Sequence, residues 1–190
     1  YVITATDSKN STDTQTVVVT ITGTNDAPVI SVESGDSASQ SISETNARLS
    51  ATDTLTVTDV DVTDTTAVSV TSVTQTGTKS EINNATLKAM MSVTSGNILT
   101  NSTTQKGFEW AFDSGGEAFD YLAVTESLVL TYVITATDSK NSTDTQTVVV
   151  TITGTNDGPA VSSAITSAAN DASATYTIDL TTNVTDVDAS

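Results

Sequence analysis

The sequence contains no cysteine and no histidine, and only two of its 190 residues are proline. The absence of cysteine excludes disulfide bonds, thiol chemistry and cysteine-ligated zinc. The absence of histidine removes the usual general base near neutral pH and the commonest ligand of transition metals. Paired carboxylates could in principle hydrolyse glycosides, but nothing in the sequence indicates an acid with a raised pKa in a cleft. We therefore expect that the chain is not an enzyme.

Basic residues are also scarce, because six Lys and Arg stand against 23 Asp and Glu, which gives a net charge of −17. A chain this acidic should not bind the backbone of a nucleic acid. Its charge could serve solubility alone, but aspartates in short spaced motifs are also what a calcium-binding protein needs. No apolar run approaches the length of about 20 residues that a membrane-spanning helix requires, so we expect no direct membrane insertion.

Threonine and valine, not aromatic residues, are abundant in the sequence. Aromatic residues make up only 4% of it and all hydrophobic residues 36%, so Val, Ile and Leu must form most of the core. Thr and Val favour a pleated, half-buried surface, which indicates an all-β protein. Apolar and polar residues alternate over 127–138 and again over 145–155, with turn residues between them, which predicts a long hairpin with one buried face. Its predicted inward-facing residues are Leu128, Leu130, Tyr132, Ile134, Ala136, Val148, Val150 and Ile152.

Further short strand-like segments precede this hairpin at the spacing expected of a sandwich. Phe108, Trp110 and Phe112 alternate along one of them, which favours a buried aromatic stripe over the alternative, a platform for stacking on sugars. The periodicity that follows residue 80 is helical instead, and it predicts one short helix near residues 81–91 with Ser80 as its cap. The fold class we expect is therefore all-β, with Ig-like or cadherin-like β-sandwiches in tandem and this one short helix.

A long internal repeat predicts how the chain is divided. Residues 1–26 recur without change as residues 132–157. A period of roughly 130 residues is too long for a solenoid unit and fits one complete β-domain per repeat. We expect residues 1–26 to be the C-terminal strands of a preceding repeat, residues 27–157 to be one complete β-sandwich repeat, and residues 158–190 to be the first strands of the next.

Acidic and amide side chains gather at the boundaries of this repeat. The run TNDAP contains Asn25 and Asp26, TDVD contains Asp59 and Asp61, and ATDSK contains Asp138. Calcium takes roughly six to eight oxygen ligands from carboxylates, amides and backbone carbonyls, which this set can supply. The same side chains could instead cap turns, which is the alternative. Their recurrence at the same relative place in two repeats favours calcium.

The recurrence is visible near the end of the chain. Asn156 and Asp157 repeat the first linker, and Asp186 and Asp188 repeat the TDVD motif. Ca²⁺ is therefore the cofactor we expect at two junctions between β-domains.

Three stretches of the sequence resemble the VCBS repeat of large bacterial surface adhesins, many of them of the RTX type. They are LTVTDVDVTDT, GFEWAFDSGGEAFDYLAVTESLVLTYVITATDS and TDTQTVVVTITGTNDAPVI. The resemblance covers essentially the whole chain and is most specific over residues 108–161. It implies an extracellular calcium-binding extender that projects a binding tip from the bacterial cell surface and supports adhesion or biofilm formation.

The junction is also similar to the linker of cadherins, in which an aspartate stands at the position of Gly23. One ligand is therefore missing, and the number of ions at each junction stays open. This second resemblance implies a division of the ligands between two junctions, in which Glu44 matches an acidic residue that a cadherin domain offers to its following linker. The first set is Asn25, Asp26, Asp59, Asp61 and Asp138, and the second is Asn156, Asp157, Asp186, Asp188 and Glu44.

The expected function is a non-catalytic, calcium-stabilised extender whose partners are neighbouring repeats of the same protein. One alternative is a subunit of an extracellular filament, in which the incomplete strands at the two ends of the chain complement each other between molecules. Another is a carbohydrate-binding module that uses Trp110.

Overall fold

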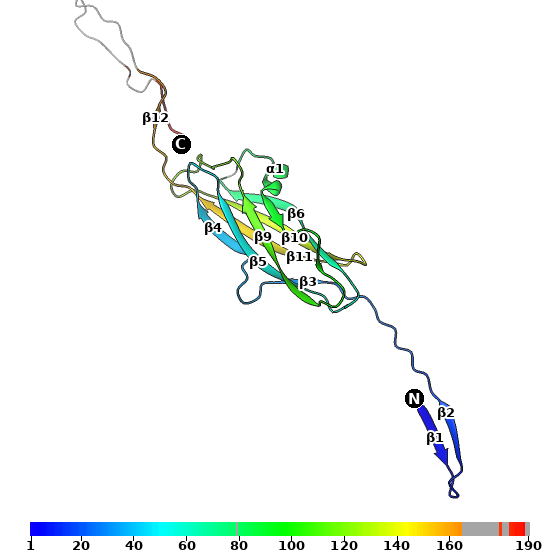
Figure 1. The fold of residues 1–190 in the computed structure, drawn as a ribbon. Coiled ribbons are helices and arrows are strands. Elements are labelled where there is room, and N and C mark those ends of the chain that lie inside the picture. Colours follow the sequence, from blue (N-terminus) through cyan, green and yellow to red (C-terminus); the bar gives the residue numbers. More distant parts are fainter. Residues whose placement is uncertain (79, 165–178, 180–182, 189–190) are drawn as a thin grey trace, which may run out of the picture.

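The structure is a computed structural model that describes residues 1–78, 80–164, 179 and 183–188. Two β-sheets face each other in a sandwich that extends from residue 29 to residue 153 (Figure 1). The five-stranded sheet has the order β4 (Ser39–Ser43), β11 (Thr143–Thr153), β10 (Ser127–Asp138), β6 (Thr66–Gly77) and β8 (Asn97–Leu99). The four-stranded sheet has the order β3 (Val29–Ser31), β5 (Ser50–Thr58), β9 (Gln105–Asp113) and β7 (Met91–Val93). The predicted all-β sandwich class is confirmed.

Neighbouring strands pair antiparallel throughout the sandwich, except that β4 runs parallel to β11. The longest ladder joins β10 to β11 in the predicted hairpin, from Ser127 opposite Thr153 to Thr137 opposite Thr143. Because β10 has 12 residues, its two ends lie about 35 Å apart. Strand β10 therefore connects the two ends of the sandwich at which the predicted site residues lie.

The core has the composition that the sequence predicts. Every second residue of β10 from Leu128 to Ala136 is fully buried, as are Val148, Val150 and Ile152 of β11. Phe108, Trp110 and Phe112 of β9 fill the opposite layer. This alternation places one side-chain face of β10 and β11 in the core and leaves the threonines, together with Val129, Val133 and Val149, on the outer face.

Trp110 is a core residue and not a sugar platform. Its side chain is fully buried, and its indole Nε1 donates a 2.8 Å hydrogen bond to the backbone oxygen of Ser37. Its ring therefore has no exposed face on which a sugar could stack, and the carbohydrate-binding interpretation loses its main support.

The predicted helix exists but is shorter than expected, because α1 spans only Asn84–Ala89. Its N-cap is Asn83, whose side chain accepts a hydrogen bond from the amide of Thr86, so the prediction of Ser80 as the cap was wrong. Asn is a better cap here because it directly precedes the first helical residue. The helical pattern extended too far, since Met91 already belongs to β7.

The repeated sequence adopts the same hairpin in two different environments. β1 (Val2–Thr6) and β2 (Thr12–Thr16) pair with Ala5 opposite Asp13, as Ala136 pairs with Asp144 in the sandwich. The first hairpin lies apart from the sandwich, at the far end of an extended linker (Figure 1), and all of its residues are exposed. Its local sequence therefore determines the hairpin, and the rest of the sandwich determines burial.

The segment that follows the sandwich begins with the same strand pairing as the sandwich itself. β12 (Ala160–Val161) pairs with β13 (Val184–Thr185), with Ala160 opposite Thr185. Val29 lies opposite Thr58 in the sandwich, at the positions that are equivalent to Ala160 and Thr185 in the repeated sequence. The division into tandem repeats stays a prediction, and part of the segment from 158 to 190 lies outside the described residues. Among the described residues, no helix is long and apolar enough to cross a membrane.

Candidate functional site

Carboxylates gather at both ends of the sandwich, in two groups that differ in how their oxygens are satisfied. The acidic trio consists of Glu44, Asp120 and Asp157 and lies beside the start of β10. The apex group consists of Asp59, Asp61, Asp64 and Asp138 and lies beside the end of β10. The linker over residues 23–26 meets the apex group, and the linker over 154–157 meets the acidic trio.

Glu44 follows strand β4 and is held against the end of β11. Its amide donates to the backbone oxygen of Thr153, and its Oε1 accepts hydrogen bonds from the amide and the hydroxyl of Thr155, at 2.7 and 2.6 Å. Only 1% of its surface is exposed, yet its Oε2 has no hydrogen-bond partner among the described residues. A buried carboxylate oxygen without a partner is costly, and a bound ion or an ordered water is among the groups that can satisfy it.

The two aspartates of the trio repeat this feature. Asp157 is 7% exposed, and its Oδ1 accepts a 2.7 Å hydrogen bond from the side-chain amide of Asn46, while no described residue bonds its Oδ2. Asp120 is half-buried, and its Oδ1 lacks a partner in the same part of the chain. One carboxylate oxygen from each of the three residues lies within 4.8 Å of the others. Three carboxylates thus lie close together, and each has one oxygen without a partner among the described residues.

The electrostatics of the trio reflect this crowding. Burial raises the pKa of Asp120, and the negative charges of Asp157 and Glu44 raise it further. Like charges at this separation disfavour ionisation, whereas a bound cation would favour the ionised form of all three.

A close backbone approach positions the trio. Gly154 directly follows strand β11, and its amide donates a 3.0 Å hydrogen bond to the backbone oxygen of Glu126. A Cβ on Gly154 would lie 2.2 Å from the backbone oxygen of Leu122 and 2.3 Å from that of Ala123. Only glycine therefore allows the linker to pass directly beside the turn that follows Asp120.

The linker after the sandwich joins the trio to the next segment. The amide of Asp157 donates a 3.3 Å hydrogen bond to Oδ2 of Asp188. A hydrogen bond between Asp186 and Asp188 raises the pKa of Asp186 and lowers that of Asp188. Asn156, another predicted ligand, bonds the backbone oxygen of Asp157 at 2.7 Å. Asp157 thus contacts both segments: its carboxylate contacts the sandwich, and its amide contacts the following segment.

The linker before the sandwich makes the equivalent contact at the apex group. The amide of Asp26 donates a 2.7 Å hydrogen bond to Oδ2 of Asp61, and the amide of Asp61 donates to Oδ1 of Asp59 at 3.0 Å. The side chain of Asn25 donates to Oδ2 of Asp138 at 2.9 Å. The structure therefore brings together all five residues predicted for the first junction.

Within the apex group, protein donors already satisfy Asp138. Its Oδ1 accepts the amides of Lys140 and Ser142, each at 2.8 Å, in addition to the bond from Asn25 to its Oδ2. Burial raises the pKa of Asp138, but the hydrogen bonds from Asn25, Ser142 and Lys140 together hold it below its usual value. Asp138 is therefore stable as a carboxylate without a metal ion.

Sequence reasoning missed two of the acids. Asp120 lies outside every repeated motif, and Asp64 follows the TDVD motif with no sign that its side chain turns inward. The structure buries Asp64 to 4% exposure and pairs one of its oxygens with the ammonium of Lys140 at 3.1 Å. The only signal in the sequence that could have indicated Asp64 was the group of acids in TDVDVTD, considered together with the basic residue Lys140 in the turn after β10.

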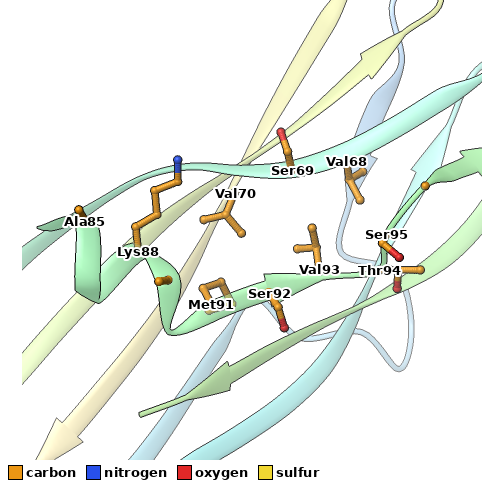
Figure 2. Close-up of a pocket in the computed structure, with 12 residues that line it drawn as sticks. Val68, Ser69, Val70, Ala85, Lys88, Met91, Ser92, Val93, Thr94 and Ser95 are labelled. Carbon is orange, nitrogen blue, oxygen red and sulfur yellow. The ribbon is translucent and has the colours of Figure 1, made fainter. Parts of the chain in front are cut away.

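An open groove of about 660 Å³ lies between β6 and β7 beside helix α1 (Figure 2). Val68 and Val70 of β6 face Met91 and Val93 of β7 across it, and the side chain of Lys88 extends from α1 toward β6 (Figure 2). Lys88 is the only ionisable residue among the described residues that line the groove. Its described lining contains no carboxylate.

Comparisons with known proteins give no family. No family model matches the chain, and no curated protein matches it. Solved structures with some likeness include the CooA pilin subunit of enterotoxigenic Escherichia coli, at 17% identity and a TM-score of 0.42, over 68% of this chain and 99% of the pilin.

Two further structures are similar to a comparable degree. The PapD-like domain 7 of human CEP192 matches at 12% identity and a TM-score of 0.39, over 74% of this chain and 94% of that domain. The periplasmic chaperone SfaE matches at 8% identity and a TM-score of 0.36, over 67% of this chain and 56% of the chaperone. At these TM-scores the likeness says nothing about what this chain binds or does.

Proposed function

We propose that this chain is a non-catalytic, calcium-stabilised extender segment of a bacterial cell-surface adhesin, located outside the cell. The observation that carries the proposal is the acidic trio: one carboxylate oxygen from each of Glu44, Asp120 and Asp157 lies within 4.8 Å of the other two, and each of these residues also has an oxygen without a partner among the described residues. The trio lies beside the linker that leaves the sandwich, which is where an ion would act on the connection between consecutive segments.

The donor set of the trio fits a hard divalent cation. All three donors are carboxylate oxygens, which suit calcium, magnesium or manganese better than softer metals. Calcium accepts irregular coordination by carboxylates, carbonyls and water, whereas magnesium requires near-ideal octahedral geometry. A bound calcium ion would offset most of the negative charge of the three crowded carboxylates. The chain itself would hold the site in shape, since Thr155 and Asn46 hydrogen-bond two of the carboxylates and thereby orient them toward the shared space.

Asp157 explains how such an ion would stiffen the connection. Its carboxylate belongs to the trio, while its amide contacts Asp188 of the next segment. Asp26 makes the equivalent amide contact to Asp61 at the other end of the sandwich. Fixing the carboxylate of Asp157 would therefore also fix the backbone group that orients the segment after it.

Calcium is expected to raise the melting temperature of the chain, and magnesium at the same concentration is not. At free calcium about 100 times the dissociation constant, one site adds about 2.7 kcal/mol to the free energy of unfolding. That gain corresponds to a rise of roughly 5–10 °C for a domain of this size. The measurement is a thermal melt in chelator, in calcium and in magnesium.

The variants Glu44→Gln and Asp120→Asn should lose most of this calcium response. Glu109→Gln, which removes one exposed carboxylate on β9, should keep it and serves as the control. An equal rise for all three variants would show that calcium acts elsewhere and would overturn the proposed site. If the wild-type chain does not respond to calcium at all, the extender proposal itself fails.

A second candidate function, a subunit of an extracellular filament, is favoured by the exposed apolar residues of the first hairpin and the linker after it. Tyr1, Ile3 and Ile21 are 86%, 58% and 90% exposed, whereas their equivalents Tyr132, Ile134 and Ile152 are fully buried. Strands of another molecule could cover this face by strand complementation.

This candidate predicts that the chain polymerises as its concentration rises, and that Ile3→Asp prevents it by placing a charge on the hairpin face. Sedimentation velocity over a wide concentration range measures the association. A monodisperse monomer at the highest concentration would exclude the filament and leave the extender.

A further inference from the structure

Lys140 is an unusual residue in this chain because it brings a positive charge into an acidic group. Its ammonium lies 3.1 Å from Oδ1 of Asp64, whose side chain is 3% exposed, while the lysine side chain is itself 61% exposed. Oδ2 of Asp64 is buried and has no partner among the described residues. Because no other donor in that part of the chain contacts this carboxylate, the ammonium provides its charge compensation.

The turn that carries Lys140 also fixes where its ammonium lies. Two amides of this turn, those of Lys140 and Ser142, bond to Oδ1 of Asp138 and anchor the turn to the apex group. Lys140 then lines a small cleft together with Gly23, Thr24 and Asn25 of the linker. Lys140 therefore contacts Asp64 beside a cleft that the linker also lines.

The cleft provides few free ligands for a metal ion. Of the described residues, only Asp61 and Asp64 line it with carboxylates, and Oδ2 of Asp61 already accepts the amide of Asp26. Gly23 contributes no side chain. The acidic trio at the other end of the sandwich has three unpartnered oxygens, and none of its described hydrogen bonds comes from a basic residue.

We propose that Lys140 is a built-in cation of the apex group, which holds Asp64 and the linker in place where a metal ion would otherwise be needed. The linker over residues 23–26 then stays docked on the sandwich without calcium, and calcium acts at the acidic trio alone. This second statement rests on the proposed function; the first does not. The proposal makes Lys140 a positioning residue that limits how many ions each junction requires.

The repeat supplies a matched control. Lys9 lies in the first copy of the same repeated sequence, and its amide donates to Asp7 at 2.8 Å, just as that of Lys140 donates to Asp138. Among the described residues, Lys140 forms a salt bridge with Asp64, whereas no salt bridge involves Lys9. Lys140→Met and Lys9→Met therefore remove the same charge from the same local sequence, and only the first removes it from a buried carboxylate.

The experiment is a thermal melt of the full chain and of each variant, in chelator and in calcium. In chelator, Lys140→Met should melt about 5 °C below the wild type, because removing one partner leaves a buried charge uncompensated. Lys9→Met should have the same melting temperature as the wild type. Calcium should raise the melting temperature of Lys140→Met by more than it raises that of the wild type, because loss of the ammonium frees Oδ1 of Asp64 beside its unpartnered Oδ2, and both oxygens can then bind an ion.

Two results would overturn the proposal. One is equal melting of Lys140→Met and Lys9→Met in chelator. The other is a loss in Lys140→Met that calcium does not offset, which would make the pair an ordinary ion pair. Failure of the trio as a calcium site shows up separately, as a wild type that does not respond to calcium.

A double variant keeps the test decisive if Lys140→Met does not fold. Asp64→Asn with Lys140→Met removes both charges, so it should fold and melt near the wild type in chelator. It should also show no extra response to calcium. A double variant that also fails to fold would contradict the assigned role of the lysine.

Discussion

Replacing Gly154 with alanine is expected to lower the free energy of unfolding by about 3 kcal/mol or more, as overpacking against a fixed neighbour does. The added Cβ would lie 2.2 Å from the backbone oxygen of Leu122 and 2.6 Å from its carbonyl carbon. Both contacts are far below van der Waals distance and involve backbone, so no side chain can rotate to relieve them. Either the end of β11 or the turn after Asp120 must shift, and both segments lie directly beside residues of the acidic trio.

Gly23 provides the control for this prediction, because it occupies the same place in the repeated sequence. A Cβ on Gly23 would meet nothing within 4 Å. Gly23→Ala should therefore change the free energy of unfolding by only a few tenths of a kcal/mol. Urea denaturation of both variants measures the difference. Similar stability of the two variants would mean that the close approach at Gly154 is not maintained in solution.

Replacing Ile134 with alanine is expected to cost about 2–5 kcal/mol, the range for removing a large aliphatic side chain from a core. Ile134 is fully buried in the middle of β10, beside a bulge in the pairing with β6. The loss combines reduced burial of apolar surface with a cavity that the surrounding strands cannot fill. Equilibrium unfolding, followed by fluorescence of the buried Trp110, measures it.

Ile3→Ala is the matched change in the first hairpin. Ile3 is 58% exposed, so its truncation should alter the stability of the sandwich by less than about 0.5 kcal/mol. A large cost at Ile3 would show that the hairpin is buried in solution. That result would favour the filament over the extender, because it would mean that another copy covers this face.

The alternating pattern of 127–138 and 145–155 was enough to predict the hairpin and its inward-facing residues, and the alternation of Phe108, Trp110 and Phe112 was enough to predict the aromatic stripe of β9. Strand periodicity succeeds here because each strand has one buried face, so the side-chain period of two is visible in the sequence. The helix boundaries were less accurate, since apolar residues after α1 continue the helical pattern into β7. A pattern of apolar spacing does not record where backbone hydrogen bonding changes.

The candidate ligands also divide into residues that the sequence indicated and a residue that only the structure revealed. Asn25, Asp26, Asp59, Asp61 and Asp138 stand in repeated motifs, and the structure brings them together. Asp120 joins Glu44 and Asp157 only because strands β4 and β11 end beside the turn in which Asp120 lies. Contacts between residues far apart in the chain depend on the topology of the sheets, which local sequence does not encode.

The sequence by itself determined an all-β chain whose hairpin forms in both copies of the repeated sequence, because alternation and turn residues act locally. Only the tertiary structure decided which copy of that hairpin is buried, since Ile134 has the opposite sheet against it and Ile3 does not. It also decided that three carboxylates share one space at one end of the sandwich, while a lysine compensates a buried aspartate at the other. Burial and charge compensation depend on which distant segments meet, and that is a property of the folded molecule.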